Sequence, residues 1–215
     1  MSAPVSPPVS PPDIGALVGA RLCHDLISPL GAIRNGLELL EMASPKAEPG
    51  PEIGLISDSL ETALAKLRYY RLAFGPADAR SRQSFGEAVQ ATDAMFSGRF
   101  TVAWETRGLD MPRPTARLIY LAILCLEKSL PMGGLVRVSV AEDAVRLTME
   151  GRRTAPPSEL WAHVTDGEPI DDLRPDCVQF AMLRQGLEET GHRLKASFTD
   201  TGVSLRLAEV SPQPA

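Results

Sequence analysis

The chain has 215 residues, a formal net charge of −5 and 44% hydrophobic residues, the composition of an ordinary globular protein with one or two domains. The acidic balance argues against a nucleic-acid-binding protein. The longest apolar run, LIYLAILCL at 118–126, is about half of the ~20 residues that a membrane span needs. Cys23, Cys125 and Cys177 are far apart and lack zinc spacing, so we expect free thiols, no resident metal and a cytoplasmic location.

The N-terminal residues 1–12 are rich in proline and serine, with neither a basic cluster nor an apolar stretch. This composition is unlike a signal peptide and predicts a disordered tail. Asp13 follows two prolines and is suited to cap the N-terminus of a helix that runs to about Met42. The stretch ASPKAEPGP at 43–51 predicts a loop.

A second helix is predicted from about Glu52 to Phe74, ended by Gly75 and Pro76. Apolar residues recur along it at intervals of three and four: Ile53, Ile56, Leu60, Ala63, Leu67, Tyr70 and Phe74. Residues 13–76 therefore predict an antiparallel helical hairpin. Because a lone hairpin cannot cover both of its apolar faces, we expect a second copy of the chain to complete a four-helix bundle, making a homodimer.

From residue 78 to 210 the pattern changes to alternating helices and strands, which predicts an α+β domain with helices layered on one face of a mixed sheet. The expected helices are 84–97, 114–130, 157–164 and 176–190, and the expected strands are 99–105, 135–141, 144–150, 192–199 and 202–209.

The face of His24 on the first helix follows from the ~100° that a helix turns per residue. One stripe is apolar and is predicted to be the bundle core: Leu22, Leu26, Pro29, Ile33, Leu37 and Leu40. His24 lies opposite this stripe and should face solvent. Its neighbours on the outer face are Arg21, Ile27, Ser28, Gly31, Asn35 and Glu38.

An exposed histidine is most often an ordinary surface residue. Here, however, small residues surround His24, and Pro29 removes a helix hydrogen bond at a cost of ~3 kcal/mol. Natural chains tolerate such costs where a site needs them. No HxxH or HxxxH pair is present to bind a metal, and Cys23 points ~100° away. The remaining chemistry makes the imidazole itself the nucleophile, forming a phosphohistidine with a phosphoryl group that another protein supplies.

The pattern His24-Asp25-Leu26-Ile27-Ser28-Pro29 resembles the H-box of sensor histidine kinases, and the hairpin and the α+β region resemble their dimerisation and ATP-binding domains. RLCHDLISPLGAIRNGLELL (21–40), taken together with LRYYRLAFG (67–75), is similar to the ChpT-type histidine phosphotransferases of alphaproteobacteria. The resemblance covers nearly the whole chain apart from the tail.

Three departures from the kinases favour a phosphotransferase. In CLEKSLPMGG (125–134), Cys125 occupies the position of the kinase asparagine that holds magnesium, and a thiol is a poor ligand for Mg²⁺. The Asp-x-Gly-x-Gly that contacts adenine is replaced by GRRTAPPSELW (151–161), and the last long helix lacks the glycines of an ATP lid. The region is therefore expected to be a degenerate ATPase-like domain without nucleotide.

The resemblance implies a phosphorelay histidine phosphotransferase in which His24 shuttles a phosphoryl group between receiver-domain aspartates of a hybrid histidine kinase and of response regulators. Arg21, Asp25 and Ser28 are the candidate supporting residues. The candidate docking residues are Ile27, Gly31, Arg34, Asn35 and Glu38. Asp25 lies off the His24 face, so an orienting or general-base role and a plain solvated charge are both open.

The resemblance implies no cofactor bound by this chain; Mg²⁺ would come with the partner receiver, and neither a nucleic acid nor a membrane is expected as a partner. Two other functions stay open. An active sensor-type autokinase would need the missing nucleotide motifs, and a non-enzymatic dimeric adaptor would keep its function without His24.

Overall fold

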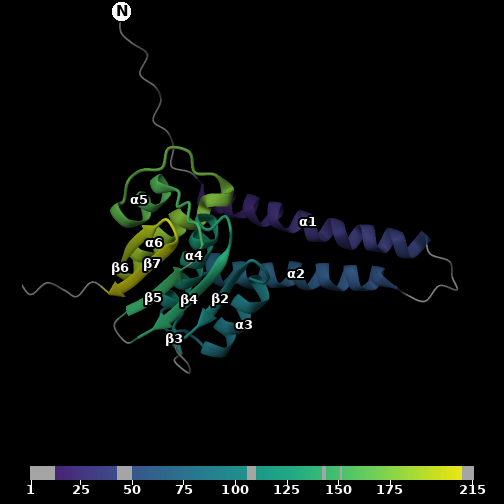
Figure 1. The fold of residues 1–215 in the computed structure, drawn as a ribbon, viewed down its shortest axis with the longest axis horizontal. Helices are drawn as coiled ribbons and strands as arrows, with labels where there is room; N and C mark the ends of the chain where they lie inside the picture. The colour runs from purple at the N-terminus through teal and green to yellow at the C-terminus, as the bar shows by residue number, and fades with distance from the viewer. Residues whose placement is uncertain (1–12, 43–49, 106–109, 142–143, 151, 210–215) are drawn as a thin grey trace, which may run out of the picture.

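The structure is a computed structural model that describes residues 13–42, 50–105, 110–141, 144–150 and 152–209. The predicted tail at 1–12 and most of the predicted loop at 43–51 lie outside these residues. Two long helices lead into a five-stranded mixed sheet with further helices on one side (Figure 1). The coarse architecture expected from the sequence, a helical hairpin followed by an α+β region, is confirmed.

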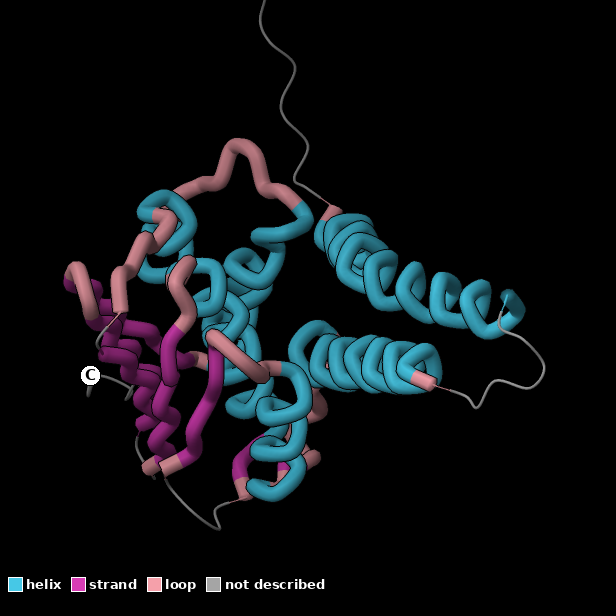
Figure 2. The backbone as a smooth tube through the Cα atoms, turned by 45° about the vertical axis from the view of Figure 1, so that its right-hand side comes forward, coloured by secondary structure: helices cyan, strands magenta, loops and turns pink. Residues whose placement is uncertain are grey.

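The first helix, α1 (Ile14–Met42), starts where predicted, because the Asp13 carboxylate accepts a hydrogen bond from the Ala16 amide at 3.1 Å. The second, α2 (Pro51–Phe74), begins at a proline and ends where the Gly75 amide bonds back to the Arg71 carbonyl at 3.2 Å. The two helices run side by side as an antiparallel pair, and their far ends extend beyond the rest of the molecule (Figures 1 and 2).

The contact between α1 and α2 follows the predicted stripe with one correction. Leu22, Leu26 and Ile33 are half-buried and Pro29 is buried, but Leu37 is 49% exposed. Gly36 takes its place at the contact, since a Cβ there would lie 2.6 Å from Ile56 Cγ1. The absence of a side chain at Gly36 lets the helices approach closely, and this shifts Leu37 to the margin.

The predicted apolar seam of α2 divides into two faces. Ile56, Ala63 and Tyr70 are half-buried or buried, whereas three residues seven apart are exposed: Ile53, Leu60 and Leu67. Leu30 and Leu37 of α1 are exposed with the same spacing. We call these five residues the open apolar stripe.

By length and composition, α1 is the one helix in the described part of the chain that could cross a bilayer. The sequence analysis considered only uninterrupted apolar runs and did not predict this. The helix also carries charged residues along its length, including Arg21, Asp25 and Arg34.

The sheet confirms all five predicted strands. They are β2 (Phe100–Trp104), β4 (Gly134–Val140), β5 (Ala144–Glu150), β6 (His192–Thr199) and β7 (Gly202–Glu209), in the order β2-β4-β5-β7-β6. β2 and β4 are parallel and every other neighbouring pair is antiparallel, with Leu147 opposite Leu205 and Leu194 opposite Leu207. Alternate residues such as these are buried, so one face of the sheet belongs to the core.

Four helices cover that face: α3 (Phe85–Met95), α4 (Arg113–Ser129), α5 (Ser158–Asp166) and α6 (Val178–Thr190) (Figure 2). The longest apolar run of the sequence lies in α4 and is buried throughout, which makes α4 the central core helix. Sequence reasoning missed the two-residue strands β1 (Arg82–Gln83) and β3 (Met111–Pro112), which pair with each other, and the short 3₁₀ helix at Pro175–Cys177 before α6.

The hairpin and the α+β region share one hydrophobic core at the base of α2. The fully buried Tyr69 donates a hydrogen bond to the Tyr120 carbonyl at 3.0 Å and packs edge-on against Phe96, with ring centres 5.0 Å apart. Arg113 and Arg117 of α4 donate to carbonyls in the last turn of α2. These contacts fix the lower part of the hairpin against the sheet region.

Candidate functional site

His24 stands on the outer side of α1, and its side chain is 84% exposed, as the helical arithmetic predicted. Its Nδ1 lies 2.9 Å from Oδ1 of Asp25. A carboxylate accepts hydrogen bonds, so this contact favours the neutral tautomer with the proton on Nδ1. The lone pair then lies on Nε2, the ring nitrogen that points away from the aspartate.

The sequence left two interpretations of Asp25 open, a functional role and a plain solvated charge, and the structure excludes the solvated charge. The Asp25 side chain is only 17% exposed, because it lies between α1 and α2. Oδ2 accepts hydrogen bonds from Arg21 Nε at 2.6 Å and from the Tyr70 hydroxyl, which comes from α2. Lys66, also on α2, donates to the Asp25 backbone carbonyl at 3.0 Å. Asp25 therefore joins the two helices and touches the histidine.

The electrostatics of Asp25 follow from these partners. Burial alone would raise the pKa of its carboxyl, but hydrogen bonds from Tyr70, His24 and Arg21, together with the Arg21 charge, lower the pKa to about 2. Burial raises the pKa of Tyr70 above its usual range, and the hydrogen bond to Asp25 raises it further against the opposing charge of Arg21. The site thus holds a carboxylate with a neutral phenol and a guanidinium as donors.

Arg21 is held inward, although the helical arithmetic placed it on the outer face beside His24. Its side chain is 12% exposed, and Nη1 donates to the Asp176 carbonyl at 2.8 Å and to Oε1 of Gln179 at 3.3 Å. The guanidinium also lies over the Tyr70 ring, 5.9 Å from its centre. Helical periodicity carries no information about the Asp176 carbonyl and the Gln179 side chain, whose oxygens accept hydrogen bonds from Arg21. For this reason it placed Arg21 on the outer face beside His24.

Comparison with known proteins connects this geometry to a family. The histidine phosphotransferase C-terminal domain family matches residues 85–202. The protein phosphotransferase ChpT of Brucella abortus (strain 2308) is 35% identical over 180 residues, which cover 80% of this chain and 84% of that protein.

This chain belongs to the ChpT family of histidine phosphotransferases.

A solved structure of a bacterial phosphotransferase superimposes on this ChpT-type chain with a TM-score of 0.77 and 28% identity, covering 96% of this chain and 100% of the other. The family resemblance stated from the sequence is confirmed. The chain is a phosphotransferase of the phosphorelay type.

The other predicted residues of the ChpT-type site lie along the outer face of α1. Ile27 and Ser28 are exposed, and the position of a Cβ on Gly31 has no atom within 4 Å. Arg34 and Glu38 are both exposed and approach each other at 3.6 Å, one turn apart. Asn35 is exposed beside them. The structure thus brings His24, Asp25 and Arg21 into one network and leaves the remaining residues as an open surface.

Three residues of the network were missed as site residues: Tyr70, Lys66 and Gln179. They lie 46, 42 and 155 positions from His24 in the sequence, on α2 and α6. Tyr70 does belong to the LRYYRLAFG stretch that carried part of the family resemblance. Its chemical role could not be deduced there, because only the hairpin geometry places its hydroxyl on Asp25.

The positions compared with the kinase magnesium motif differ in burial. Cys125 is completely buried in α4, and this burial raises the pKa of its thiol well above the usual value. Lys128, at the end of the same helix, forms an ion pair with Asp176. Among the described residues, no group of three or more histidine, cysteine or acidic side chains is arranged to hold a metal ion.

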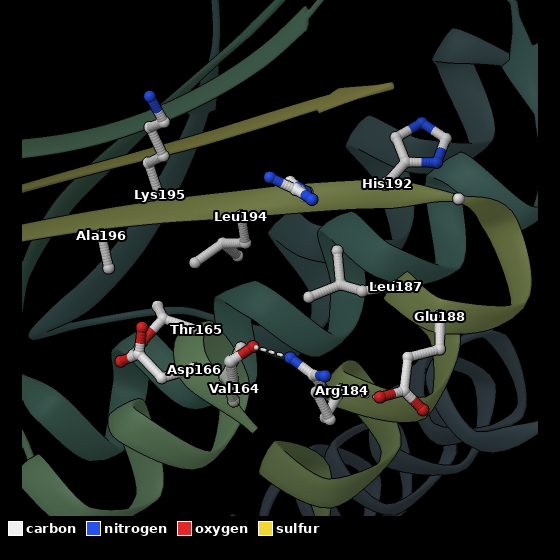
Figure 3. Close-up of a pocket in the computed structure, with 12 residues that line it drawn as sticks. Val164, Thr165, Asp166, Arg184, Leu187, Glu188, His192, Leu194, Lys195 and Ala196 are labelled. Atoms are coloured by element: carbon white, nitrogen blue, oxygen red, sulfur yellow. Dashed lines mark hydrogen bonds and ion pairs between the residues drawn. The ribbon is translucent and has the colours of Figure 1, made fainter. Parts of the chain in front are cut away.

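A cleft of about 810 Å³ lies elsewhere, between α5, α6 and the outer strand β6 (Figure 3). Arg184 spans it, with Nη1 donating to the Val164 carbonyl at 3.4 Å and Nε paired with Glu188 at 2.7 Å. No residue of the His24 network lines this cleft, so its size does not mark the phosphotransfer site.

Proposed function

We propose that Nε2 of His24 is the atom that carries the phosphoryl group, accepting it from the aspartyl phosphate of one receiver domain and passing it to the aspartate of another. One observation carries the proposal. His24 is a highly exposed histidine whose Nδ1 faces a half-buried carboxylate, so that Nε2 is directed outward with its lone pair available.

The chemistry of transfer fits this arrangement. The Nε2 lone pair attacks phosphorus in line, the N–P bond forms and the bond from phosphorus to the receiver aspartate breaks, leaving a carboxylate. The proton stays on Nδ1, so the ring gains positive charge as the bond forms. The Asp25 carboxylate, 2.9 Å away, stabilises that charge. In the return step a second receiver carboxylate attacks phosphorus, and neutral imidazole leaves.

The experiment uses the other two histidines of the chain as controls. A receiver domain labelled with radioactive phosphate is mixed with the wild type, His24→Ala, His163→Ala and His192→Ala. We expect acid-labile, base-stable label on all except His24→Ala. Because the His24 side chain is highly exposed, its removal should leave the circular dichroism spectrum unchanged. Label on folded His24→Ala at the wild-type level would refute the assignment.

We further propose that the receiver docks on the outer face of α1 around His24, with Ile27 and Gly31 in apolar contact and Arg34, Asn35, Glu38 and Ser28 at the rim. Ile27 is 68% exposed, which is unusual for an isoleucine without a partner. Mg²⁺ for the reaction would come with the receiver, since the acidic pocket of a receiver domain supplies the oxygen ligands that the ion prefers.

The open apolar stripe supports a homodimer with a four-helix bundle. Leu30 and Leu37 on α1, and Ile53, Leu60 and Leu67 on α2, repeat every seven residues. This spacing keeps one helix face toward a partner helix. A second copy brings an identical stripe, so the two hairpins would bury each other's leucines.

Two further properties belong to the same proposal. Buried Cys125, with its protonated thiol, supports an α+β region that no longer binds Mg-ATP and an enzyme without autokinase activity. A cytoplasmic location agrees with this assignment, because α1 packs against α2 and carries the charged residues Arg21, Asp25 and Arg34 along its length.

A further inference from the structure

The network around Asp25 reaches from the α+β region to the reactive histidine. Gln179 at the start of α6 is 99% buried; its Nε2 donates to the Asp176 carbonyl at 3.1 Å, and its Oε1 accepts from Arg21. Arg21 in turn donates through Nε to Asp25. A continuous chain of hydrogen bonds therefore connects α6 to α1, and its Arg21–Gln179 link joins residues 158 positions apart in the sequence.

The two oxygens of Asp25 have separate partners. Oδ2 is occupied by Arg21 Nε and the Tyr70 hydroxyl, whereas Oδ1 contacts His24 Nδ1. Two donors from different elements on one oxygen fix the rotation of the carboxylate. The second oxygen is then presented to the imidazole in one direction.

An exposed histidine otherwise has little to hold its ring. Within the described part of the chain, the contact of Nδ1 with Asp25 is the one hydrogen bond of the His24 ring. If the carboxylate rotated away, Nδ1–H would lose its acceptor, the tautomer with the proton on Nε2 would become more populated, and the ring would be free to turn about its Cβ–Cγ bond. The direction of the Nε2 lone pair therefore depends on groups that do not contact the histidine.

We propose that Tyr70 and Gln179 are positioning residues for phosphotransfer: Tyr70 fixes Oδ2 of Asp25, and Gln179 anchors Arg21, so that the α+β region helps to hold His24 in its reactive tautomer. This inference rests on the proposed role of His24 as the phosphoryl acceptor. It assigns to the α+β region a direct part in the geometry of the site on the hairpin.

The charged and titratable groups around Asp25 come from three helices, α1, α2 and α4. Arg21 and His24 lie on α1, Lys66 and Tyr70 on α2, and Glu127 on α4, where burial raises the pKa of its carboxyl and Arg21 opposes that rise. Tyr70→Phe removes only a neutral hydroxyl from this set. It keeps the ring that stacks on Phe74 and lies under Arg21.

The chain offers a matched control in the neighbouring residue. Tyr69 is also a buried tyrosine of α2 with a bonded hydroxyl, but its hydroxyl donates to the Tyr120 carbonyl, away from Asp25. Tyr69→Phe should therefore lower the melting temperature without any effect on His24. For Gln179→Met the control is Gln185→Met, since Gln185 lies on the same helix and bonds Glu189 on the surface.

The test measures the His24 ring by ¹⁵N NMR in the unphosphorylated protein, together with single-turnover phosphotransfer from a labelled receiver. We expect Tyr70→Phe and Gln179→Met to increase the fraction of the Nε2–H tautomer. The maximal rate should fall about tenfold, the order of loss when a group that orients a histidine is removed. The receiver concentration at half-maximal rate should stay the same, and both controls should match the wild type in tautomer and rate.

The outcomes separate the two proposals. If His24→Ala still accepts label, the proposed function is wrong. If His24 is the acceptor but folded Tyr70→Phe and Gln179→Met keep the wild-type tautomer and rate, the positioning role is wrong. Equal losses in Tyr69→Phe and Tyr70→Phe would also overturn it, since they would show a general effect of core damage.

Discussion

At the scale of single residues, Asp25 is the group on which the site depends. It follows the exposed His24 in sequence, yet it turns toward α2 and accepts hydrogen bonds from a tyrosine and an arginine. The half-buried carboxylate stays ionised because three donors surround it. The same contacts that serve the histidine therefore also hold α1 to α2.

The stability of the protein should depend on pH through Asp25. Its pKa of about 2 in the folded protein lies below the ordinary value of 3.8, so its contribution is complete above about pH 4 and is lost as the pH falls toward 2. The shift corresponds to about 2 kcal/mol. The measurement is urea unfolding of the wild type and of Asp25→Asn at one protein concentration. The difference between their free energies of unfolding should be largest above pH 4, and it should decrease by about 2 kcal/mol as the pH falls to near 2. A difference that is constant with pH would contradict this account.

The sequence determined the position of His24 but not its surroundings. Helical periodicity suffices to place one residue on the outside of a helix, and it did so for His24. The partners of Asp25 and Arg21 come from α2 and α6, and no local pattern specifies which distant side chain meets them. Arg21 was placed on the outer face for this reason, whereas its hydrogen bond to Gln179 holds it inward.

At the scale of elements, α1 uses its two inner glycines differently. Gly36 is buried, and its missing side chain makes room for Ile56. Gly31 has open space where a Cβ would be, so no packing within the described chain requires glycine there. Under the docking mode proposed above, its small size would let a receiver approach the His24 face closely.

Substitutions at Gly31 should separate docking from folding. Gly31→Ala should raise the free energy of unfolding by up to about 1 kcal/mol, because alanine is the better helix former, and should keep activity. Gly31→Arg should also fold, but its long side chain should block the receiver and reduce phosphotransfer by more than tenfold. Circular dichroism and transfer from a labelled receiver measure the two effects. A fully active Gly31→Arg would show that the receiver docks on another face.

The helices and strands themselves were predicted closely. All five strands of the sheet agree with the sequence pattern within one residue at each end, because alternation of buried and exposed residues is a local property. The errors concern short or close-packed features. β1 and β3 have two residues each and exist only because they pair with each other, and Leu37 was displaced by the close contact at Gly36.

At the scale of the whole molecule, the far ends of α1 and α2 extend away from the α+β region (Figure 1). The open apolar stripe lies on these two helices. Five large apolar side chains in regular array are costly to leave in water, at about 25 cal/mol for each Å² of apolar surface. A second hairpin placed against the stripe, as proposed above, would remove this cost and complete a four-helix bundle.

A charge within the stripe should separate the two copies. Leu60→Lys would place two lysines in the apolar interface of the dimer, so we expect a monomer by light scattering at micromolar concentration. Glu61→Lys, at the next position and outside the stripe, is the matched control and should remain a dimer. A wild-type protein that is monomeric, or a Leu60→Lys variant that stays dimeric, would contradict the proposed bundle.

The shared core at the base of α2 also limits how this chain can be divided. Tyr69 packs against Phe96 and Tyr120, and the last carbonyls of α2 are satisfied by arginines of α4. A cut near residue 77 would leave aromatic surface on both fragments and unbonded carbonyls on one. The hairpin is therefore not a portable module that could be grafted onto another protein with its histidine intact, and any transplant of its specificity would have to carry α4 with it.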